Sequence, residues 1–237
     1  MDRIRLFCLP YAGGSAQFYM NWKNYLSPEI ELYPIELAGR GKRYTDPIKN
    51  SIEEIVDDIY EKVKNEIDKM PYMLFGHSMG SLIAFELSHK LIAKNHLEPF
   101  NIFISGRKAP RITANSKSYE LSDDNFKELI FNMGGTPMEI LNSPNFEELF
   151  LPILRSDFKA VETYIYQEKN QKLNSMLSLM YGNYDEIDIK EITPWKEETS
   201  KDTKVYEFLG GHFFIQNNIV EITNIINKTA NDYLKKI

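Results

Sequence analysis

Leu74-Phe75-Gly76-His77-Ser78-Met79-Gly80 is the stretch of sequence that decides the fold. It has the pattern G-x-S-x-G, follows an apolar run that begins at Tyr72, and precedes an apolar segment that begins at Ser81 and can form a helix. This context is typical of a nucleophile elbow, a tight turn between a buried strand and a helix, with Ser78 as the nucleophile. The glycines are needed because a Cβ at either place would crowd the turn. The same pattern also occurs by chance in loops, but the flanking signals favour the elbow.

Strand-like and helix-like segments alternate on both sides of the elbow. The chain contains apolar runs typical of strands at 4–9, 30–35, 72–75, 100–105, 175–182 and 204–209, and segments with helical spacing at 16–26, 51–67, 81–94 and 220–234. Ser51, followed three residues later by Glu54, is a capping-box signature for one of these helices. The alternation predicts a mostly parallel central sheet with helices on both faces.

The segment 106–173 interrupts this alternation and is too long for a single crossover connection. It carries its own helix signals: Ser122 can cap a helix with an apolar face, and Ser143-Pro144 can begin another. We therefore expect a single domain over residues 1–237, with a helical lid inserted at about 110–170. The alternative is that this segment packs as part of the ordinary core.

The composition narrows the classes of function. The chain has 237 residues, is 43% hydrophobic and carries a net charge of -6, whereas a general nucleic-acid binder is usually basic. Its single cysteine, Cys8, excludes an intrachain disulfide and lies in an apolar run, which favours a buried side chain over a catalytic thiol. The N-terminus does not resemble a signal peptide, and no apolar run is long enough to cross a bilayer. We expect a cytoplasmic protein that binds neither nucleic acid nor membranes.

A serine nucleophile needs a base that removes its proton, and the chain has four histidines. His77 adjoins Ser78, so its side chain should diverge and pack beside the turn. His89 and His96 lie on or after the helix that follows the elbow, where we expect exposed positions. His212 follows the last predicted strand, at the sheet edge where ligand-facing residues collect. It is the predicted base, and a structural role in the turn is the alternative.

The acid that orients the base should lie between serine and histidine in the sequence. Asp185 does so, directly after the predicted strand 175–182, and Asp188 is a rival one short turn further. We favour Asp185, whose carboxylate would fix the tautomer of His212 and stabilise its protonated form. The remaining candidates belong to the expected lid or precede the last strand: Asp123, Asp124, Asp157 and Asp202.

An oxyanion that forms during attack on a carbonyl needs two N–H donors. The backbone N–H of Met79 is one donor by the geometry of the elbow. The second should come from the loop Pro10-Tyr11-Ala12-Gly13-Gly14 after the first strand, and we choose Ala12. A phosphate-binding loop is the alternative, but the G-K-[ST] ending and the G-x-G-x-x-G spacing are missing. No metal site is expected.

Six stretches along nearly the whole chain together resemble the external type II thioesterases, which accompany nonribosomal peptide and polyketide synthases. They are 7–16 (FCLPYAGGSA), 37–41 (LAGRG), 75–80 (FGHSMG), 105–110 (SGRKAP), 134–137 (GGTP) and 210–214 (GGHFF). The resemblance implies an α/β-hydrolase fold with a helical lid, and a catalytic triad of Ser78, Asp185 and His212.

The resemblance also implies a substrate class. Type II thioesterases hydrolyse acyl or aminoacyl groups from the phosphopantetheine arm of acyl or peptidyl carrier proteins, to clear stalled synthases or to release products. The enzyme would need no cofactor of its own, and we expect it to be a monomer. Carrier proteins are usually acidic near the arm, so we expect them to bind basic residues after the strands; these are Arg40, Lys42, Arg43, Arg107 and Lys108, with Arg111 beside them. The alternative is that these are ordinary surface or structural charges.

Three other functions remain open from the sequence. The same triad could hydrolyse oxygen esters, as in a lipase or carboxylesterase. It could also transfer the acyl group to an amine or alcohol. A non-catalytic protein that only binds carriers would follow if Asp185 and His212 proved too far apart to form a hydrogen bond.

Overall fold

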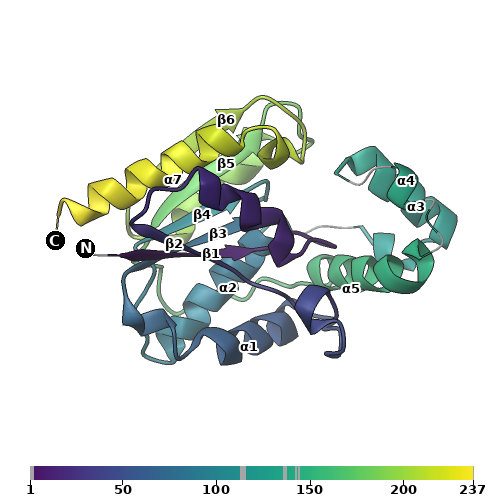
Figure 1. Cartoon of the computed structure of the whole chain (residues 1–237), viewed down its shortest axis with the longest axis horizontal. Coiled ribbons are helices and arrows are strands. Elements are labelled where there is room, and N and C mark those ends of the chain that lie inside the picture. Colours follow the sequence, from purple (N-terminus) through teal and green to yellow (C-terminus); the bar gives the residue numbers. More distant parts are fainter. Residues whose placement is uncertain (1–2, 113–115, 136–137, 142, 144, 237) are drawn as a thin grey trace.

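The computed structural model describes residues 3–112, 116–135, 138–141, 143 and 145–236. Its centre is a six-stranded sheet in the order β2-β1-β3-β4-β5-β6 (Figure 1). Every neighbouring pair of strands is parallel, which confirms the mostly parallel sheet expected from the sequence. The strands are β1 (Ile4–Leu9), β2 (Ile30–Pro34), β3 (Tyr72–His77), β4 (Asn101–Ser105), β5 (Met176–Gly182) and β6 (Thr203–Phe208).

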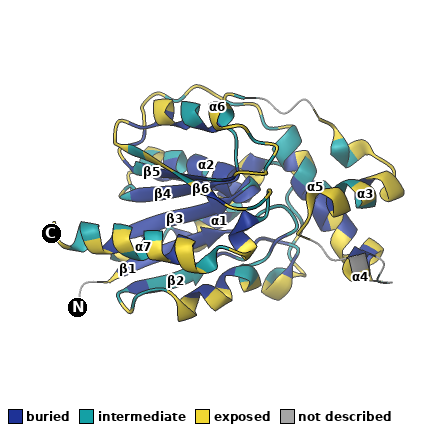
Figure 2. Cartoon of the chain, turned by 90° about the horizontal axis from the view of Figure 1, so that it is seen from above, coloured by how far each residue is buried: buried dark blue, intermediate teal, exposed yellow. Residues whose placement is uncertain are grey.

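Helices cover both faces of this sheet. Helices α1 (Ile52–Val63) and α2 (Met79–Ala93) lie on one face, and the 3-10 helix η1 (Ala16–Asn24) and helix α7 (Ile219–Leu234) lie on the other (Figure 1). Successive residues of a strand point to opposite faces. In β1, Phe7 and Leu9 therefore join the core with α1 and α2, whereas Leu6 and Cys8 join the core with η1 and α7. Figure 2 shows the inner strands β1, β3 and β4 buried between helices whose outer faces are exposed.

Local sequence explains where several elements begin and end. Ser51 caps α1, because its side chain accepts a hydrogen bond from the N–H of Glu54 at 3.2 Å. Pro34 ends β2 at the edge of the sheet, where a missing N–H is tolerated. The shorter elements are η2 (Gly41–Arg43), η3 (Ile67–Lys69), η4 (Ser118–Glu120), α6 (Ile189–Ile192), η6 (Thr193–Glu198) and η7 (Phe214–Gln216).

The chain between β4 and β5 holds a group of helices, as the sequence indicates: α3 (Asp123–Met133), α4 (Met138–Leu141) and α5 (Leu151–Glu162), with a π-helical turn η5 (Phe146–Phe150) before α5. Ser122 caps α3 by accepting from the N–H of Asn125 at 3.4 Å. The predicted start at Ser143-Pro144 lies partly outside the described residues, because Pro144 is not among them. Helix α5 lies near the sheet, while α3 and α4 project away from it (Figure 1).

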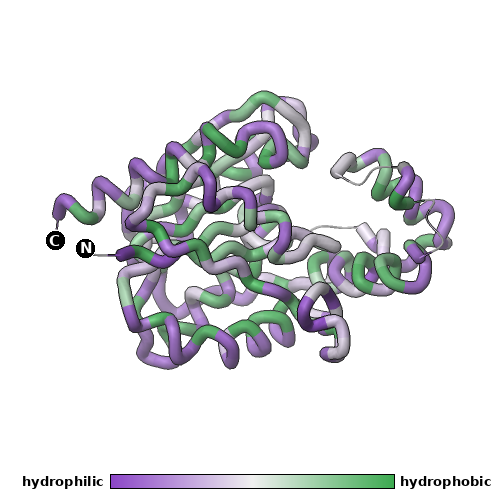
Figure 3. The backbone as a smooth tube through the Cα atoms, viewed as in Figure 1, coloured by the Kyte–Doolittle hydropathy of each residue, from purple (hydrophilic) through white to green (hydrophobic). Residues whose placement is uncertain are grey.

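This insertion has a small apolar core of its own, made by Phe126, Ile130, Leu141, Phe146, Leu151 and Leu154. Figure 3 shows apolar residues in the central strands and hydrophilic residues along the outer sides of α1 and α7. In the part of the chain that the structure describes, no helix combines the length and the apolar character that a membrane span requires.

Candidate active site

Ser78 lies at the junction of β3 and α2, in the turn that the sequence predicts. Its backbone has φ 51° and ψ -114°, a region that residues other than glycine rarely adopt. A Cβ on Gly76 would lie 2.1 Å from the carbonyl oxygen of Gly80, and a Cβ on Gly80 would lie 2.2 Å from that of Leu9. Both glycines of the motif are therefore required by close backbone contacts within the elbow and against β1.

Strand β4 holds the elbow from the side. The N–H of Ser78 donates to the carbonyl oxygen of Ser105 at 2.7 Å. The hydroxyl of Ser81 lies 2.8 Å from the carbonyl oxygen of Gly76 and 3.0 Å from that of Ser105, and it accepts from the N–H of Ser105 at 3.0 Å. These buried hydrogen bonds fix the start of α2 against β4, so the strained conformation of Ser78 is set by its surroundings.

His77 packs beside the turn, which confirms the expectation from the sequence. It is fully buried, and its Nδ1 lies 2.9 Å from the hydroxyl of Ser105. Burial lowers the pKa of His77 well below the ordinary value, and the neighbouring charge of His212 acts in the same direction. The two imidazole rings lie 5.2 Å apart between centroids. His77 is therefore a neutral neighbour of the predicted base.

Two other histidine predictions are wrong. His89 and His96 were expected on exposed surface, but both are partly buried. His96 is held by Asp68, 2.7 Å from its Nδ1, and by the hydroxyl of Tyr60, 3.2 Å from its Nε2. His89 packs edge-on against the ring of Phe85, with centroids 4.7 Å apart. Neither contact is visible as a sequence pattern, because each side chain is covered by its particular neighbours in space.

Asp185 and His212 come together at the carboxyl ends of β5 and β6. The Nδ1 of His212 and the Oδ2 of Asp185 lie 2.9 Å apart, and the two side chains are 15% and 5% exposed. The two loops cross closely, since a Cβ on Gly182 would lie 2.3 Å from the carbonyl oxygen of Gly210, and the N–H of Tyr184 donates to that oxygen at 2.9 Å. A non-catalytic protein was the alternative if Asp185 and His212 lay too far apart to form a hydrogen bond. They do form one, so this argument for a non-catalytic protein does not apply.

Asp188, the rival acid, has a different partner. Its carboxylate accepts from the N–H of Lys190 at 2.9 Å, and Glu191 completes a capping box by accepting from the N–H of Asp188 at 3.1 Å. Asp188 is thus the N-cap of α6, whereas the hydrogen bond of His212 is to Asp185.

The loop of residues 10–14, here called the glycine loop, forms a tight turn after β1. The N–H of Gly14 donates to the carbonyl oxygen of Tyr11 at 2.8 Å, and Gly13 has φ +73°. The N–H groups of Ala12 and Met79 donate to none of the residues that the structure describes. The ring of Tyr11 contacts the rings of His77 and Phe213, at 5.9 and 5.1 Å between centroids. The loops after β1, β3 and β6 therefore meet at one edge of the sheet.

The structure corrects the predicted carrier-binding residues. Arg40 is only 6% exposed, and its guanidinium forms a two-pronged ion pair with the fully buried Asp157. Arg43 pairs in the same way with Asp58, at 2.6 and 2.7 Å, and is 15% exposed. The prediction that Arg40 receives a carrier from solvent is wrong, because Arg40 is buried and an internal carboxylate already neutralises it. Arg43 is partly exposed and is neutralised by Asp46 and Asp58, so its contact with a carrier stays a prediction.

The other basic residues differ in their surroundings. Lys42 is exposed and has no ion pair with any described residue. Lys108 is 41% exposed and pairs with Glu191 at 2.7 Å, and Arg111 pairs with the buried Glu198 at 2.8 Å. Arg107 is partly buried, and burial lowers its pKa to about 10. Among the described residues, Lys42 is therefore the cation of the predicted set that is both exposed and free of an ion pair.

No local sequence pattern marks Asp157 as more than a residue of the insertion. In the structure its Oδ2 accepts from the N–H of Gly13 at 2.7 Å as well as from Arg40. Its partners lie 144 and 117 residues away in the sequence, so no local pattern could have identified it. Within the described residues, no group of three or more His, Cys, Asp or Glu side chains is placed to hold a metal ion.

Comparisons with known proteins agree with this geometry. Residues 4–230 match the thioesterase domain family. The gramicidin S biosynthesis protein GrsT of Aneurinibacillus migulanus is 31% identical over 228 residues, which cover 95% of this chain and 88% of that protein. Among solved structures, ClbQ from the colibactin NRPS/PKS pathway has a TM-score of 0.93 and 32% identity, with 98% of each chain covered.

A further solved structure, the type II thioesterase BorB from the borrelidin biosynthetic cluster, has a TM-score of 0.86 and 28% identity, with 95% of this chain and 92% of that chain covered. These similarities confirm the expected α/β-hydrolase fold and an enzyme that hydrolyses thioesters. The chain therefore belongs to the thioesterase family, among the type II thioesterases of nonribosomal peptide and polyketide biosynthesis.

Proposed function

We propose that this enzyme removes acyl or aminoacyl groups from the phosphopantetheine arm of acyl or peptidyl carrier proteins, through an acyl-Ser78 intermediate. The hydrogen bond between Asp185 and His212, at the same sheet edge as the strained Ser78, is the observation that carries the proposal. All residues of the proposed machinery come from one chain, so a monomer is sufficient for activity.

In the first half of the reaction, the Oγ of Ser78 attacks the thioester carbonyl carbon while His212 accepts the hydroxyl proton at Nε2. Asp185 holds the opposite ring nitrogen as its N–H donor and stabilises the positive charge that forms on the ring. The carbonyl oxygen becomes an oxyanion, for which the free N–H groups of Ala12 and Met79 are the proposed donors. The C–S bond then breaks, and the pantetheine thiol leaves with the proton from His212.

In the second half, water attacks the acyl carbon of the Ser78 ester and gives its proton to His212. The same two N–H groups bind the second oxyanion. The bond between the acyl carbon and Oγ then breaks, the proton returns from His212 to Ser78, and the free acid leaves. Acid–base chemistry by side chains is sufficient for both halves, so we propose no cofactor of the enzyme itself, and phosphopantetheine enters only as part of the substrate.

The substrate class rests on the relatives together with the site. GrsT is a gramicidin S biosynthesis protein, and ClbQ belongs to an NRPS/PKS pathway. Synthases of these kinds carry their intermediates as thioesters on carrier proteins. The comparisons do not favour a lipase or carboxylesterase, nor an acyltransferase that uses the same triad, since the matches are to thioesterases.

The test is mass spectrometry of a panel of carrier proteins loaded with acetyl, longer acyl and aminoacyl groups, before and after incubation with the enzyme. We expect loss of the acyl mass with retention of the phosphopantetheine arm. Ser78→Ala should leave every carrier loaded, and p-nitrophenyl esters measure the competing esterase activity. Unimpaired hydrolysis by Ser78→Ala, or turnover of oxygen esters alone, contradicts the proposal.

A further inference from the structure

The insertion touches the glycine loop through one helix. Leu154 and Asp157 lie three residues apart on α5 and therefore share one side of that helix. A Cβ on Gly13 would lie 2.4 Å from the Cδ2 of Leu154, so the loop backbone is in close contact with α5. Leu154 also belongs to the apolar core of the insertion, with Phe126 and Ile130. The position of the glycine loop is thus tied to the packing of the insertion.

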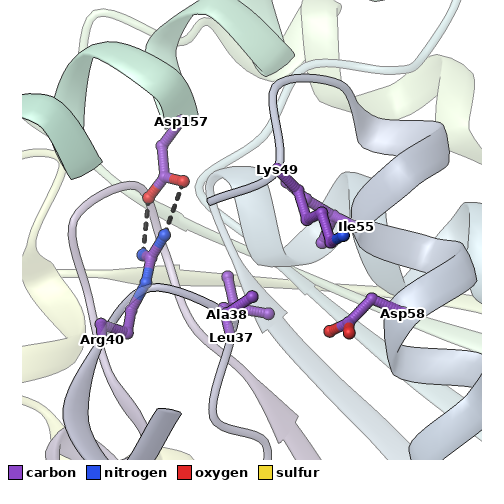
Figure 4. A pocket seen from close by; sticks show the side chains of 7 residues that line it. All are labelled: Leu37, Ala38, Arg40, Lys49, Ile55, Asp58 and Asp157. Carbon is purple, nitrogen blue, oxygen red and sulfur yellow. Dashed lines mark hydrogen bonds and ion pairs between the residues drawn. The ribbon is translucent and has the colours of Figure 1, made fainter. Parts of the chain in front are cut away.

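Asp157 and Arg40 form hydrogen bonds with two successive residues of the glycine loop. The Oδ2 of Asp157 accepts from the N–H of Gly13 at 2.7 Å, and Arg40 donates to the carbonyl oxygen of Gly14 at 3.1 Å. Within the pair, the two terminal nitrogens of Arg40 lie 2.7 and 2.8 Å from the two carboxylate oxygens of Asp157. The dashed lines in Figure 4 mark these two contacts. Such charge-assisted, two-pronged pairs have a defined geometry. Two segments far from the glycine loop in sequence therefore hold it in place: α5 and the loop after β2.

The pair holds the peptide groups next to Ala12. The Tyr11 carbonyl oxygen accepts from Gly14, and this oxygen belongs to the same peptide group as the N–H of Ala12. In a trans peptide the carbonyl and the N–H point in opposite directions, so this turn directs the N–H of Ala12 away from its own interior. If the peptide groups of Gly13 and Gly14 lost their partners, the turn could relax and the N–H of Ala12 would lose its fixed direction.

We propose that Asp157 and Arg40 are positioning residues for the glycine loop, and that through them α5 sets the direction of the Ala12 N–H that binds the oxyanion. This inference rests on the proposed function, because it assumes Ala12 as a donor. The pair itself does not touch the substrate. The cavity beside it has a volume of about 10 Å³ and is lined by residues such as Leu37, Lys49 and Ile55 (Figure 4). That volume fits about one water molecule and is far too small for an acyl group.

The test separates positioning from stability. Removing one member of a buried ion pair leaves a buried charge, whereas replacing both with apolar residues is often tolerated. The double variant Arg40→Met/Asp157→Leu therefore keeps the packing but loses both hydrogen bonds to the loop. We expect it to fold with an unfolding temperature near that of the wild type, and to lose about 10- to 100-fold in kcat with little change in KM, because the loss is confined to the transition state.

An alkyl boronic acid, whose boron binds the serine oxygen to form a tetrahedral anion, gives a second measurement. We expect its inhibition constant to rise in parallel with the fall in kcat, on a small thioester as well as on a loaded carrier. Arg5→Met is the control, because Arg5 is also buried and paired, with Glu31 and Glu66 near the amino ends of the strands. These two carboxylates are partly exposed, so the substitution leaves no buried charge. The control should leave kcat and boronate affinity within about twofold of wild type.

A folded double variant with wild-type kcat overturns the inference. The inference is also overturned if the fall in kcat is accompanied by a matching fall in the unfolding temperature while the affinity for the boronate is unchanged. If the double variant fails to fold, Arg40→Lys decides the question, because it keeps the charge but loses the two-pronged geometry; unchanged kcat and boronate affinity then overturn the inference. Each of these outcomes requires an active wild type, so failure of the proposed function is recognised separately, by a wild type that hydrolyses no thioester.

Discussion

At the scale of single residues, backbone contacts and hydrogen bonds fix the positions of the groups that form the site. Ser78 has a positive φ in a turn that hydrogen bonds to β4 hold in place, and backbone atoms leave no room for a Cβ on Gly76 or Gly80. The N-terminus of α2 begins directly after Ser78, so the positive end of the helix dipole lies where the oxyanion forms. Within the described part of the chain, one carboxylate, that of Asp185, is hydrogen-bonded to the ring of His212. These features make the roles of individual side chains separable by mutation.

The two candidate acids should respond differently to the same change. We expect Asp185→Asn to lower kcat by about 10³- to 10⁴-fold, because an amide can hold the wrong tautomer of His212 and cannot stabilise its positive charge. Asp188→Asn should leave kcat within about twofold, since asparagine is as good an N-cap as aspartate. Steady-state kinetics on a loaded carrier measure both. A large loss for Asp188→Asn, with little for Asp185→Asn, would reverse the assignment.

His89 should make stability depend on pH. Burial lowers its pKa to about 4 from an ordinary 6.5, and the charge of Lys169 acts in the same direction. The unfolded chain therefore binds a proton that the folded chain does not, and the free energy of unfolding falls as the pH drops below 6.5. Between about pH 7 and about pH 5 the wild type should lose free energy of unfolding. We expect His89→Gln to reduce this loss by roughly 1 kcal/mol, after allowance for solvent screening.

Urea unfolding of wild type and His89→Gln at a series of pH values provides the measurement. The difference between the two proteins at about pH 8 serves as the baseline, because the histidine is neutral there in both states. If the free energies of unfolding of the two proteins differ by the same amount from about pH 8 down to about pH 5, the lowered pKa of His89 is contradicted.

At the scale of elements, loops after parallel strands bring the site together. The loops that follow β1, β3, β5 and β6 supply, in turn, the glycine loop, Ser78, Asp185 and His212. Collection of functional groups at the carboxyl ends of strands is the rule for open parallel sheets. The insertion adds a second layer: α5 contacts the glycine loop at Gly13, and Gly135 after α3 lies so close to Phe213 that a Cβ there would be 2.7 Å from the ring. The insertion therefore contacts the site on two sides.

The short helix η2 is the element at which we expect a carrier protein to bind, through Lys42. We expect Lys42→Glu to lower kcat/KM for a loaded carrier by about 3- to 10-fold at low salt, because a rim charge mainly affects association. Hydrolysis of a small thioester should not change. Lys94→Glu is the control, because Lys94 is also exposed but lies far from the site. It is the C-cap of α2, whereas Ser78 lies at the opposite end of this helix. Equal losses on carrier and small thioester would refute a docking role.

At the scale of the whole molecule, two apolar cores cover the two faces of the sheet, and the site lies at the carboxyl ends of the strands. Cys8 lies in β1 at the centre of the core with η1 and α7 and is fully buried. Burial raises the pKa of the thiol well above the ordinary value, so the side chain stays protonated. Its reactivity therefore reports on opening of the core and not on catalysis.

Labelling of Cys8 with a disulfide reagent should be slower in the native protein than in the unfolded protein by roughly a thousandfold or more, because the thiol reacts only after the core opens. The labelling rate should rise with urea along with loss of the native circular dichroism signal. Treatment of the native enzyme with the reagent should leave thioesterase activity unchanged. Fast labelling accompanied by loss of activity would indicate a thiol in the site.

The sequence by itself determined the features that depend on neighbouring residues. The elbow around Ser78, the strands and α1 with its cap at Ser51 follow from local spacing, turn chemistry and burial pattern, and the sequence order of serine, acid and histidine limited the triad to few candidates. Only the tertiary structure decided between Asp185 and Asp188, because the choice depends on two loops that cross at Gly182 and Gly210. It also decided that Arg40 is internal, since its carboxylate partner lies 117 residues away. Contacts between such distant segments depend on how the elements pack, and packing leaves no pattern in the local order of residues.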